Sequence, residues 1–436
     1  MAVDYNVVIL GGHLEARWAA WWASQQGARV ALVTYGEADW GMAAVGYWSR
    51  IGSIAQQVQQ AAWLFGEAHE RQPHWERAYR WVEHQVWCCQ SRYGDGALLQ
   101  AGVDVVAGPG RFITEPTLAV QTPERTLRAC GYIVAMTGTP LLPEIPELRH
   151  LSFQTVGDWR LWDKHPGRVA IWGNTPVGVV LAQAWTRLGV LVVFPVAEPR
   201  VLPVEEEWVT QRLTCVLEAE GVQVQTATPV KRITQQPTGI QLDTPQGGWE
   251  VDTLVLTTPP ALPPESLGSI ELRRQGPYLQ VNRYLQTSHP QIYAVGDAIG
   301  HYPVPAVVGY ELAIALRNIL YRRRRPTYRQ LSWLIPTDPV LLRQGWTETQ
   351  ARHHYPHQLR IQTQPHSKRI DHQRGELLGW HTLDNLAPYR HYSVIPDQHL
   401  TWDSWRWLLG ETRLPTAPQP TWWRRAWFTW QRDGTP

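Results

Sequence analysis

The stretch from residue 5 to residue 34 constrains the fold more than any other part of the chain. An apolar run, Val7 to Leu10, predicts a strand buried on both faces, and Gly11-Gly12 follows it as a tight turn. An alanine-rich helix then extends to about Gln26, and the segment from Arg29 to Val33 returns as a second buried strand. This βαβ order is typical of a dinucleotide-binding unit, because the helix N-terminus offers free N–H groups and a positive dipole end to a diphosphate.

The same unit occurs a second time, at residues 168 to 194. It has a strand over Arg168 to Trp172, a turn from Gly173 to Gly178, a helix to about Leu188 and a strand over Val190 to Phe194. Two such units far apart in one chain predict two nucleotide domains and electron transfer between two cofactors. We therefore expect an α/β fold with two Rossmann-like domains.

Composition and length narrow the class of protein further. A chain of 436 residues predicts about three domains. The net charge of +2 argues neither for nor against nucleic acid, and no nucleic-acid partner is expected. None of the four cysteines stands at zinc or disulfide spacing, so no metal site is expected. No apolar run approaches the roughly 18 residues of a membrane span, and the first residues do not read as a signal peptide, so we expect a cytoplasmic protein.

Five motifs then follow one another in a familiar order. Thr137-Gly138 ends the strand from Tyr132, Arg200 to Pro203 closes the second βαβ unit, Gly296-Asp297 ends a strand from Gln291, and Pro336 to Pro339 opens a third domain. Together with Val7 to Val33, these motifs resemble the pyridine nucleotide-disulfide oxidoreductases, the flavoprotein family of dihydrolipoamide dehydrogenase, mercuric reductase and glutathione reductase. The resemblance covers residues 5 to about 350.

The resemblance implies a domain plan and two cofactor sites. It places a discontinuous FAD-binding domain at 1–148 and 270–325, an NAD(P)-binding-like domain at 149–269, and a truncated α+β dimerisation-like domain at 326–400, which implies a homodimer. A Trp/Arg-rich tail follows at 401–436. The implied FAD-binding residues are Gly11, Gly12, His13, Ala16, Thr34, Gly41, Thr137, Gly138, Gly296 and Asp297. Those implied for NAD(P)H are Gly173, Thr175, Gly178 and Arg200.

Several positions in the first site depart from the family pattern. His13 stands where a glycine lets the backbone approach the diphosphate, and Ala16 stands at the third glycine. Thr34 occupies the place of the acidic residue that holds the ribose. Against these departures, Asp297 remains in position to accept a hydrogen bond from the ribityl chain of FAD.

The second site departs in a similar way. Thr175 replaces the middle glycine, and Pro195 occupies the acidic position. Glu198 or Arg200 are the candidate substitutes, the latter against a 2′-phosphate.

The redox centre departs most. The family carries two cysteines in the segment that corresponds to Gly41 to Arg50, and here those places hold Met42 and Tyr47. Neither side chain can act as half of a dithiol. The family's C-terminal His-Glu pair also lacks a counterpart in this sequence. The resemblance therefore implies a flavoprotein without disulfide chemistry, and no catalytic residue is predicted.

Smaller features have ordinary interpretations. Helices are expected at about 50 to 66 and 73 to 90, the second carrying Cys88 and Cys89 as buried, inert thiols. The histidines His353, His354 and His357 are expected in a solvated loop.

The tail at residues 421–432 combines tryptophan with arginine. As a helix it would place Trp423, Ala426, Trp427 and Trp430 on one face. Three readings stay open: the tail docks on its own domain, in the groove of a partner protein, or on a membrane surface, where the protein would be peripheral.

Two functions are consistent with these residues. The first is an FAD-dependent oxidoreductase that passes electrons from NAD(P)H to a quinone or another small acceptor, which Asp297 and the Thr-Gly turn favour. The alternative is a non-catalytic descendant that acts as a binding or assembly subunit through its tail, which His13, Thr34 and Pro195 favour.

Overall fold

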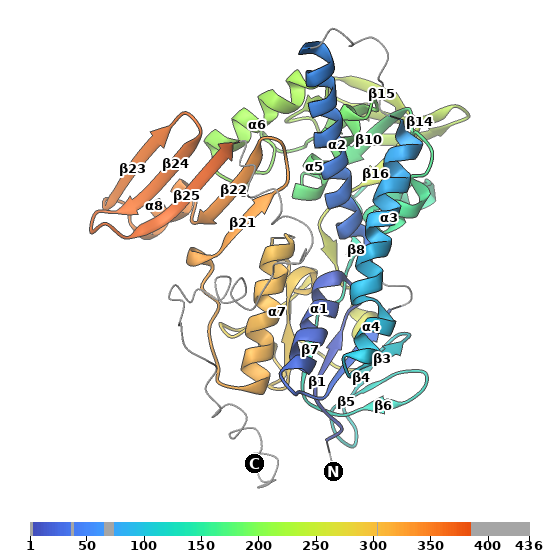
Figure 1. Ribbon diagram of the computed structural model, residues 1–436, viewed down its shortest axis with the longest axis vertical. Helices are drawn as coiled ribbons and strands as arrows, with labels where there is room; N and C mark the ends of the chain where they lie inside the picture. Colours follow the sequence, from blue (N-terminus) through green and yellow to red (C-terminus); the bar gives the residue numbers. More distant parts are fainter. Residues whose placement is uncertain (1–2, 36–38, 65–73, 303, 385–436) are drawn as a thin grey trace.

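The computed structural model describes residues 3–35, 39–64, 74–302 and 304–384. Two parallel sheets and one antiparallel sheet organise these residues (Figure 1). The predicted tail helix at 421–432 lies outside the described residues. Among the residues that are described, no helix is long and apolar enough to cross a membrane, and no group of acidic, histidine or cysteine side chains is arranged to hold a metal ion.

The first parallel sheet is built around the first βαβ unit. Its central strands are buried on both faces, as their continuous Val, Ile and Leu composition predicts. In spatial order the strands are β20 (Ile292–Ala294), β7 (Ala129–Val134), β1 (Tyr5–Leu10), β2 (Val30–Thr34) and β3 (Val103–Ala107). Because the strands are parallel, the turns after β1, β7 and β20 meet at one edge.

Helices and a small meander complete this part of the molecule. Helices α1 (Leu14–Gln25) and α7 (Pro305–Leu320) pack side by side over β1 and β7 (Figure 1). An antiparallel meander is formed by β4 (Arg111–Ile113), β5 (Ala119–Gln121) and β6 (Thr126–Leu127). Helix α4 (Asp95–Gln100) leads into β3. The short pair β18 (Arg274–Gln275) and β19 (Tyr278–Leu279) precedes β20.

The second parallel sheet repeats the arrangement. Its spatial order is β12 (Gln223–Gln225), β11 (Leu191–Pro195), β10 (Arg168–Trp172), β16 (Thr253–Leu256) and β9 (Gln154–Thr155). Helices α5 (Pro176–Arg187) and α6 (Glu207–Ala219) belong to this unit, with the antiparallel strands β13 (Arg232–Gln236), β14 (Gly239–Thr244) and β15 (Gly247–Val251). The two Rossmann-like cores are therefore confirmed.

One long helix joins the two parallel sheets. Helix α2 spans Gly41–Leu64 and runs beside α3 (Trp75–Tyr93) from the first unit to α5 of the second (Figure 1). The expected helix start near residue 50 is wrong by about two and a half turns, because the segment from Gly41 contains no proline that would interrupt the helix. A Cβ added at Gly52 would lie 2.8 Å from the Cα of Ala184, so α2 and α5 meet backbone to backbone.

Four tryptophans fill the junction between α2, α3 and α5. Trp48 stacks on Trp75 with ring centroids 4.6 Å apart, and Trp185 meets Trp162 edge-on at 4.9 Å. Burial of four indoles contributes several kcal/mol at about 25 cal/mol per Å² of apolar area. Four of the 25 tryptophans therefore serve the contact between the two nucleotide units.

The third domain is an antiparallel sheet that projects from the second unit (Figure 1). Its order is β21 (Ser332–Ile335), β22 (Val340–Gly345), β25 (Leu377–Asp384), β24 (Ser367–His372) and β23 (Leu359–Gln364). Buried ion pairs tie it to the second unit: Arg343 to Glu205 at 3.3 Å and Arg187 to Asp338 at 3.2 Å. Breaking such a pair on one side costs about 3–5 kcal/mol, because the other charge stays buried.

Two smaller expectations need correction. Cys89 is buried on α3 as expected, but Cys88 on the same helix is exposed, because successive residues of a helix point about 100° apart and Cys89 is the one that faces the core. His353 and His354 end helix α8 (Glu348–His354) instead of lying in a loop, since Thr347 and Gln350 form a capping box that starts a helix there.

Candidate dinucleotide sites

The first glycine turn has the close packing of a dinucleotide site. A Cβ added at Gly11 would lie 2.0 Å from the carbonyl oxygen of Ala135, so only glycine lets β1 turn this tightly against the end of β7. Gly12 follows, and His13 is the N-cap of α1. Its Nδ1 lies 3.3 Å from the backbone N of Ala16 and 2.8 Å from Oε2 of Glu15. The side chain at the middle glycine position therefore covers one of the N–H groups that would bind a diphosphate.

Three carboxylates surround this imidazole. Burial opposes the charged form of His13, but the hydrogen bond and charge of Glu15 and the charges of Asp297 and Asp39 outweigh it and raise the pKa of His13. Burial raises the pKa of Asp297 to about 6, although His13 and a hydrogen bond from the Gly138 N–H oppose the rise. The turn after β1, the turn after β7 and the turn after β20 thus meet, as parallel strands predict.

Gly138 sits where the two nucleotide units cross. A Cβ there would lie 2.6 Å from the backbone of Ala261, because β8 (Thr139–Pro140) pairs with β17 (Pro260–Ala261). The Thr137-Gly138 turn therefore carries both a hydrogen bond to Asp297 and the first of the crossing strands. This crossing of the two units lies at the edge of the predicted FAD site.

Thr34 ends β2 and is buried there. The next residue, Tyr35, donates its hydroxyl hydrogen bond to the carbonyl of Gly110, with the carbonyl of Ser266 at 3.4 Å. Burial raises the pKa of Tyr35 to about 12, so the phenol stays a neutral donor. The end of β2 is thereby held against the turn before β4, instead of presenting a carboxylate.

A buried carboxylate supports the Gly296-Asp297 turn, and the sequence analysis did not identify it. Glu311 of α7 is 0% exposed; it accepts from the Gly296 N–H at 2.8 Å and from the Tyr328 hydroxyl at 2.7 Å. His301 Nδ1 lies 2.5 Å from the same carboxylate. Burial opposes the charged form of His301, but Glu311 outweighs it and raises the pKa of His301. A single acidic residue within the mainly apolar sequence of α7 was the available indication.

Arg17 is a second functional residue that the sequence analysis missed. Its side chain on α1 is 1% exposed, and its Nε donates to the carbonyl of Gly12 at 2.8 Å. Its Nη1 donates to Asp95 at 2.7 Å, which ties the glycine turn to the start of α4. Arg17 therefore fixes the turn from behind. A charged residue within an Ala/Trp helix was the sequence feature that could have indicated it.

The two places of the family's cysteines lie five residues apart on helix α2 and have different surroundings. Met42 is half-buried in the first turn of α2, next to Gly41. Tyr47 is buried, with its hydroxyl 3.2 Å from the Sγ of Cys89 and its ring edge-on to Trp81 at 5.8 Å. Tyr47 thus belongs to the packing of α2 on α3.

The second glycine turn repeats the geometry of the first. A Cβ at Gly173 would lie 2.3 Å from the backbone of Thr257, and Thr175 is the N-cap of α5. The Thr175 hydroxyl accepts from the Gly178 N–H at 3.2 Å and donates to the Thr257 carbonyl at 2.8 Å. In both units, therefore, the residue at the middle glycine position caps the helix with its side chain.

The candidates after β11 make contacts within the protein. Arg200 donates to the carbonyls of Pro203 at 2.7 Å and Glu205 at 3.1 Å. Asn174 donates to the Glu198 carboxylate at 3.0 Å and accepts from the Leu202 N–H at 2.7 Å. These contacts order the loop beside the turn, and a role for Arg200 at a 2′-phosphate stays a prediction.

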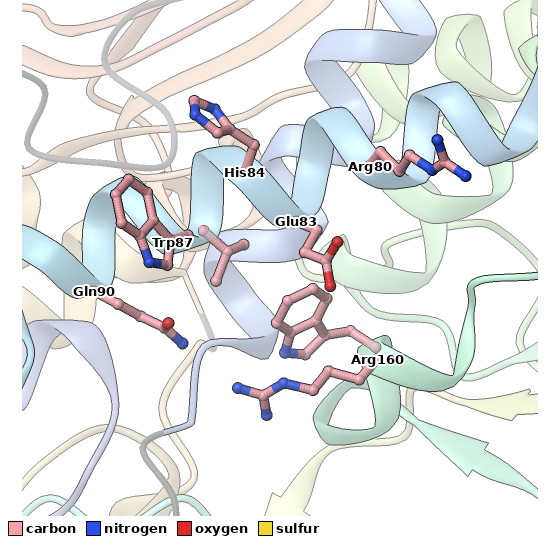
Figure 2. Close-up of a pocket in the computed structure, with 8 residues that line it drawn as sticks. Arg80, Glu83, His84, Trp87, Gln90 and Arg160 are labelled. Atoms are coloured by element: carbon pink, nitrogen blue, oxygen red, sulfur yellow. The ribbon is translucent and has the colours of Figure 1, made fainter.

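A hollow of about 380 Å³ lies elsewhere, between α3 and the 3₁₀ helix η2 (Val156–Leu161). Figure 2 shows Arg80, Glu83, His84 and Trp87 reaching from α3, with Arg160 across from them. None of the predicted cofactor residues lines this hollow. The glycine turns, the crossing and the Asp297 turn therefore remain the candidate site.

These residues fit FAD in most respects. Gly11 leaves the close approach that a diphosphate needs, and α1 presents its N-terminus to it. The Asp297 carboxylate stands at the same edge, where it can accept from a sugar hydroxyl. The His13 side chain is the departure. The crossing that follows Thr137-Gly138 lies between the two glycine turns and joins the two units through the β8–β17 pairing.

Comparison with known proteins gives one family. The family described as pyridine nucleotide-disulphide oxidoreductase matches residues 5–322. A mercuric reductase from Staphylococcus aureus is 24% identical over 374 residues, which cover 80% of this chain and 66% of that protein. RclA of Escherichia coli, named a probable pyridine nucleotide-disulfide oxidoreductase, is 26% identical over 361 residues, which cover 80% of this chain and 78% of RclA.

Solved structures agree in fold. The Cu(II) complex of the HOCl-induced flavoprotein disulfide reductase RclA from Escherichia coli superposes with a TM-score of 0.71 at 19% identity, over 98% of this chain and 99% of that one. LpdA from Mycobacterium tuberculosis gives a TM-score of 0.73 at 20% identity, over 88% of this chain and 90% of that one.

Proposed function

The chain belongs to the pyridine nucleotide-disulphide oxidoreductase family, and from that premise we propose that it passes electrons from NAD(P)H through FAD to a quinone or another small acceptor without a redox-active disulfide. Membership of this family of FAD-dependent oxidoreductases implies binding of FAD and of NAD(P)H. What we propose beyond family membership is the kind of electron acceptor and the absence of a redox-active thiol pair.

The proposal rests on the residues that occupy the two cysteine positions of the family. Met42 offers a thioether, and Tyr47 is turned into the α2–α3 contact beside Cys89. All four cysteines are free, and Cys88 and Cys215 are exposed on other surfaces. A dithiol relay needs two sulfurs within bonding reach of each other. Neither Met42 nor Tyr47 supplies a thiol, so an acceptor that needs no thiol is favoured.

The chain's own residues have distinct tasks in this proposal. The chemistry that the flavin supplies when bound is two-electron transfer, while the protein binds and orients it. Gly11, with the N-terminus of α1, would hold the diphosphate of FAD, and Asp297 would accept a hydrogen bond from a ribityl hydroxyl. Gly173 and the N-terminus of α5 would hold the nicotinamide dinucleotide. The β8–β17 crossing keeps the two units in register.

The experiment begins with the visible spectrum of the purified chain. Flavin bands are expected, and NAD(P)H added without oxygen should bleach them. A quinone should then restore the bands, whereas oxidised glutathione should not. A protein that stays colourless when FAD is added would overturn the proposal and favour the alternative, a non-catalytic binding or assembly subunit. Rapid turnover of a disulfide would overturn the absence of thiol chemistry.

Asp297→Ala gives the matched site variant. Loss of a hydrogen bond to a charged group costs about 1.5–3 kcal/mol, so FAD affinity should fall by about tenfold to a hundredfold. Asp163→Ala, at an exposed position outside the site, is the control and should bind FAD as the parent does.

We also propose that the third sheet makes the chain a homodimer. The domain has the place in the chain of the family's dimerisation domain, and it is bound to the second unit by the buried Arg343–Glu205 pair. Light scattering should then give about twice the chain mass of 49.8 kDa. A mass of one chain at micromolar concentration would refute it.

A further inference from the structure

The His13 side chain stands inside the diphosphate part of the proposed FAD site. It lies directly after Gly11-Gly12, at the position where a fingerprint glycine leaves space, and it is the N-cap of the 12-residue helix α1. Its side chain is 13% exposed and that of Glu15 is 16% exposed, so both groups are largely removed from water. Any diphosphate at this helix N-terminus must meet them.

A single atom of His13 serves two contacts that exclude each other. Nδ1 lies 3.3 Å from the Ala16 nitrogen, which can only donate, and 2.8 Å from the Glu15 carboxylate, which accepts when ionised. A bare Nδ1 accepts from Ala16 and faces Glu15 without a proton between them. A protonated Nδ1 donates to Glu15 and leaves the Ala16 N–H without its acceptor.

We propose that His13 is a diphosphate-binding residue of this site: as an imidazolium paired with Glu15 it releases the Ala16 N–H to the diphosphate of FAD and adds a positive charge beside it. The inference rests on the proposed function, because it needs FAD at the first glycine turn. In this proposal a charged side chain stands where a fingerprint glycine would leave space.

The charges around His13 make its protonation necessary for binding. Glu15 comes from α1, Asp39 from the segment before α2, and Asp297 from the turn after β20. Arg17, one turn along α1, is committed to the Gly12 carbonyl and to Asp95. With His13 neutral, a diphosphate would face carboxylates and a capped N–H group. With His13 charged, it meets a cation and a free donor.

The second site shows what a fixed cap does instead. Thr175 also caps its helix at the middle glycine position, but its hydroxyl cannot ionise near neutral pH and is bound to the Thr257 carbonyl as well. Its cap on the Gly178 N–H does not change with protonation. The contrast predicts that proton-dependent binding belongs to FAD alone.

The test is a fluorescence titration of the full-length apoprotein with FAD and with riboflavin, from about pH 6 to about pH 9. His13 is an imidazolium below its raised pKa and neutral above it. FAD affinity should therefore fall as pH rises, by at least about tenfold over this range. Riboflavin has no diphosphate, but it shares the contact with Asp297. Its affinity should therefore change much less, which separates titration of Asp297 from that of His13.

Two variants identify the residue responsible. His13→Asn keeps an N-cap but cannot become a cation, so its FAD affinity should be weak and independent of pH. His13→Gly restores the glycine and should bind FAD with little dependence on pH. Thermal melts check that both variants fold.

Several results would overturn the inference. One is an FAD affinity of the parent that is flat with pH; another is a His13→Asn variant that keeps the parent's pH dependence. Binding by His13→Gly but not by the parent at any pH would make His13 an obstacle and would overturn the proposed function as well, whereas a parent that binds FAD with a flat pH profile overturns the inference alone. Absence of FAD binding in both, at every pH, would overturn the proposed function together with the inference.

Discussion

Single buried charges hold the glycine turns of the first unit in place. Arg17 fixes the Gly12 carbonyl from behind, and Glu311 fixes the Gly296 N–H from below. Neither residue belongs to a dinucleotide fingerprint, yet each hydrogen-bonds the backbone of a fingerprint residue. The site is therefore positioned by ionised groups that are themselves withdrawn from solvent, and their replacement should affect folding before it affects chemistry.

Glu311→Gln should destabilise the protein by about 1–3 kcal/mol, because an amide cannot accept from Gly296, Tyr328 and His301 as the carboxylate does. The loss should depend on pH. Since Glu311 raises the pKa of His301 in the folded state, its contribution is fully present below the unfolded pKa and is lost as pH rises through the folded pKa.

Urea unfolding of parent and variant on the acidic and alkaline sides of that window measures this prediction. The difference between them should be larger on the acidic side. Glu144→Gln, at an exposed position, serves as the control and should change stability by no more than about 0.5 kcal/mol. An equal loss at both pH values would show that His301 does not contribute through its charge.

Replacing all four cysteines by serine should leave NAD(P)H oxidation with a quinone within a few-fold of the parent. The cysteines are free, and the buried one, Cys89, meets Tyr47 on the α2–α3 contact. Some stability should be lost there, so a triple variant that keeps Cys89 is the matched control. A fall in turnover by orders of magnitude in both variants would place the redox centre on a thiol.

At the scale of elements, the sequence predicts what is local and continuous. The strands around Val8 and Ala170 follow from unbroken apolar runs, and the turns follow from Gly11 and Gly173. The predicted start of α2 was wrong, because no local sequence feature shows whether the helix begins at residue 41 or residue 50. The difference is decided by contacts with η2 and α5, which are distant in sequence.

The same reasoning explains which site residues were missed. Arg17 contacts Asp95, 78 residues away, and Glu311 contacts Gly296 and Tyr328 from the middle of an apolar helix. His13 was recognised as an obstacle, whereas its role as an N-cap is visible only with the geometry of Ala16 and Glu15. Contacts of this kind follow from the fold and not from spacing.

Gly52→Ala tests the contact between α2 and α5. The added methyl would lie 2.8 Å from the Cα of Ala184, which is backbone that cannot move aside alone, and overpacking of this kind costs about 1–3 kcal/mol. Gly96→Ala in α4 is the control, because nothing lies within 4 Å of its Cβ and the helix should gain about 0.5–1 kcal/mol. Thermal melts should therefore shift in opposite directions; a Gly52→Ala protein as stable as the parent would contradict the close contact.

At the scale of the whole molecule, the tail remains a prediction. Truncation after Leu414 removes the Trp/Arg segment 421–432, whose burial against a protein groove or an anionic membrane face would contribute a few kcal/mol at about 25 cal/mol per Å². The truncated protein should melt as the parent does and lose recovery with membranes or a complex. A much lower melting temperature would show instead that the segment docks on its own domain.

Helix α2, which joins the two nucleotide units, also limits where residues can be inserted into the chain or deleted from it. Gly41 meets Val156 and Gly52 meets Ala184, and eleven residues at 3.6 per turn return to the same side of α2. One residue inserted between them would rotate Gly52 by about 100° and present a different side chain to α5. The stretch from Gly41 to Gly52 therefore tolerates substitution at its outer face, but neither insertion nor deletion.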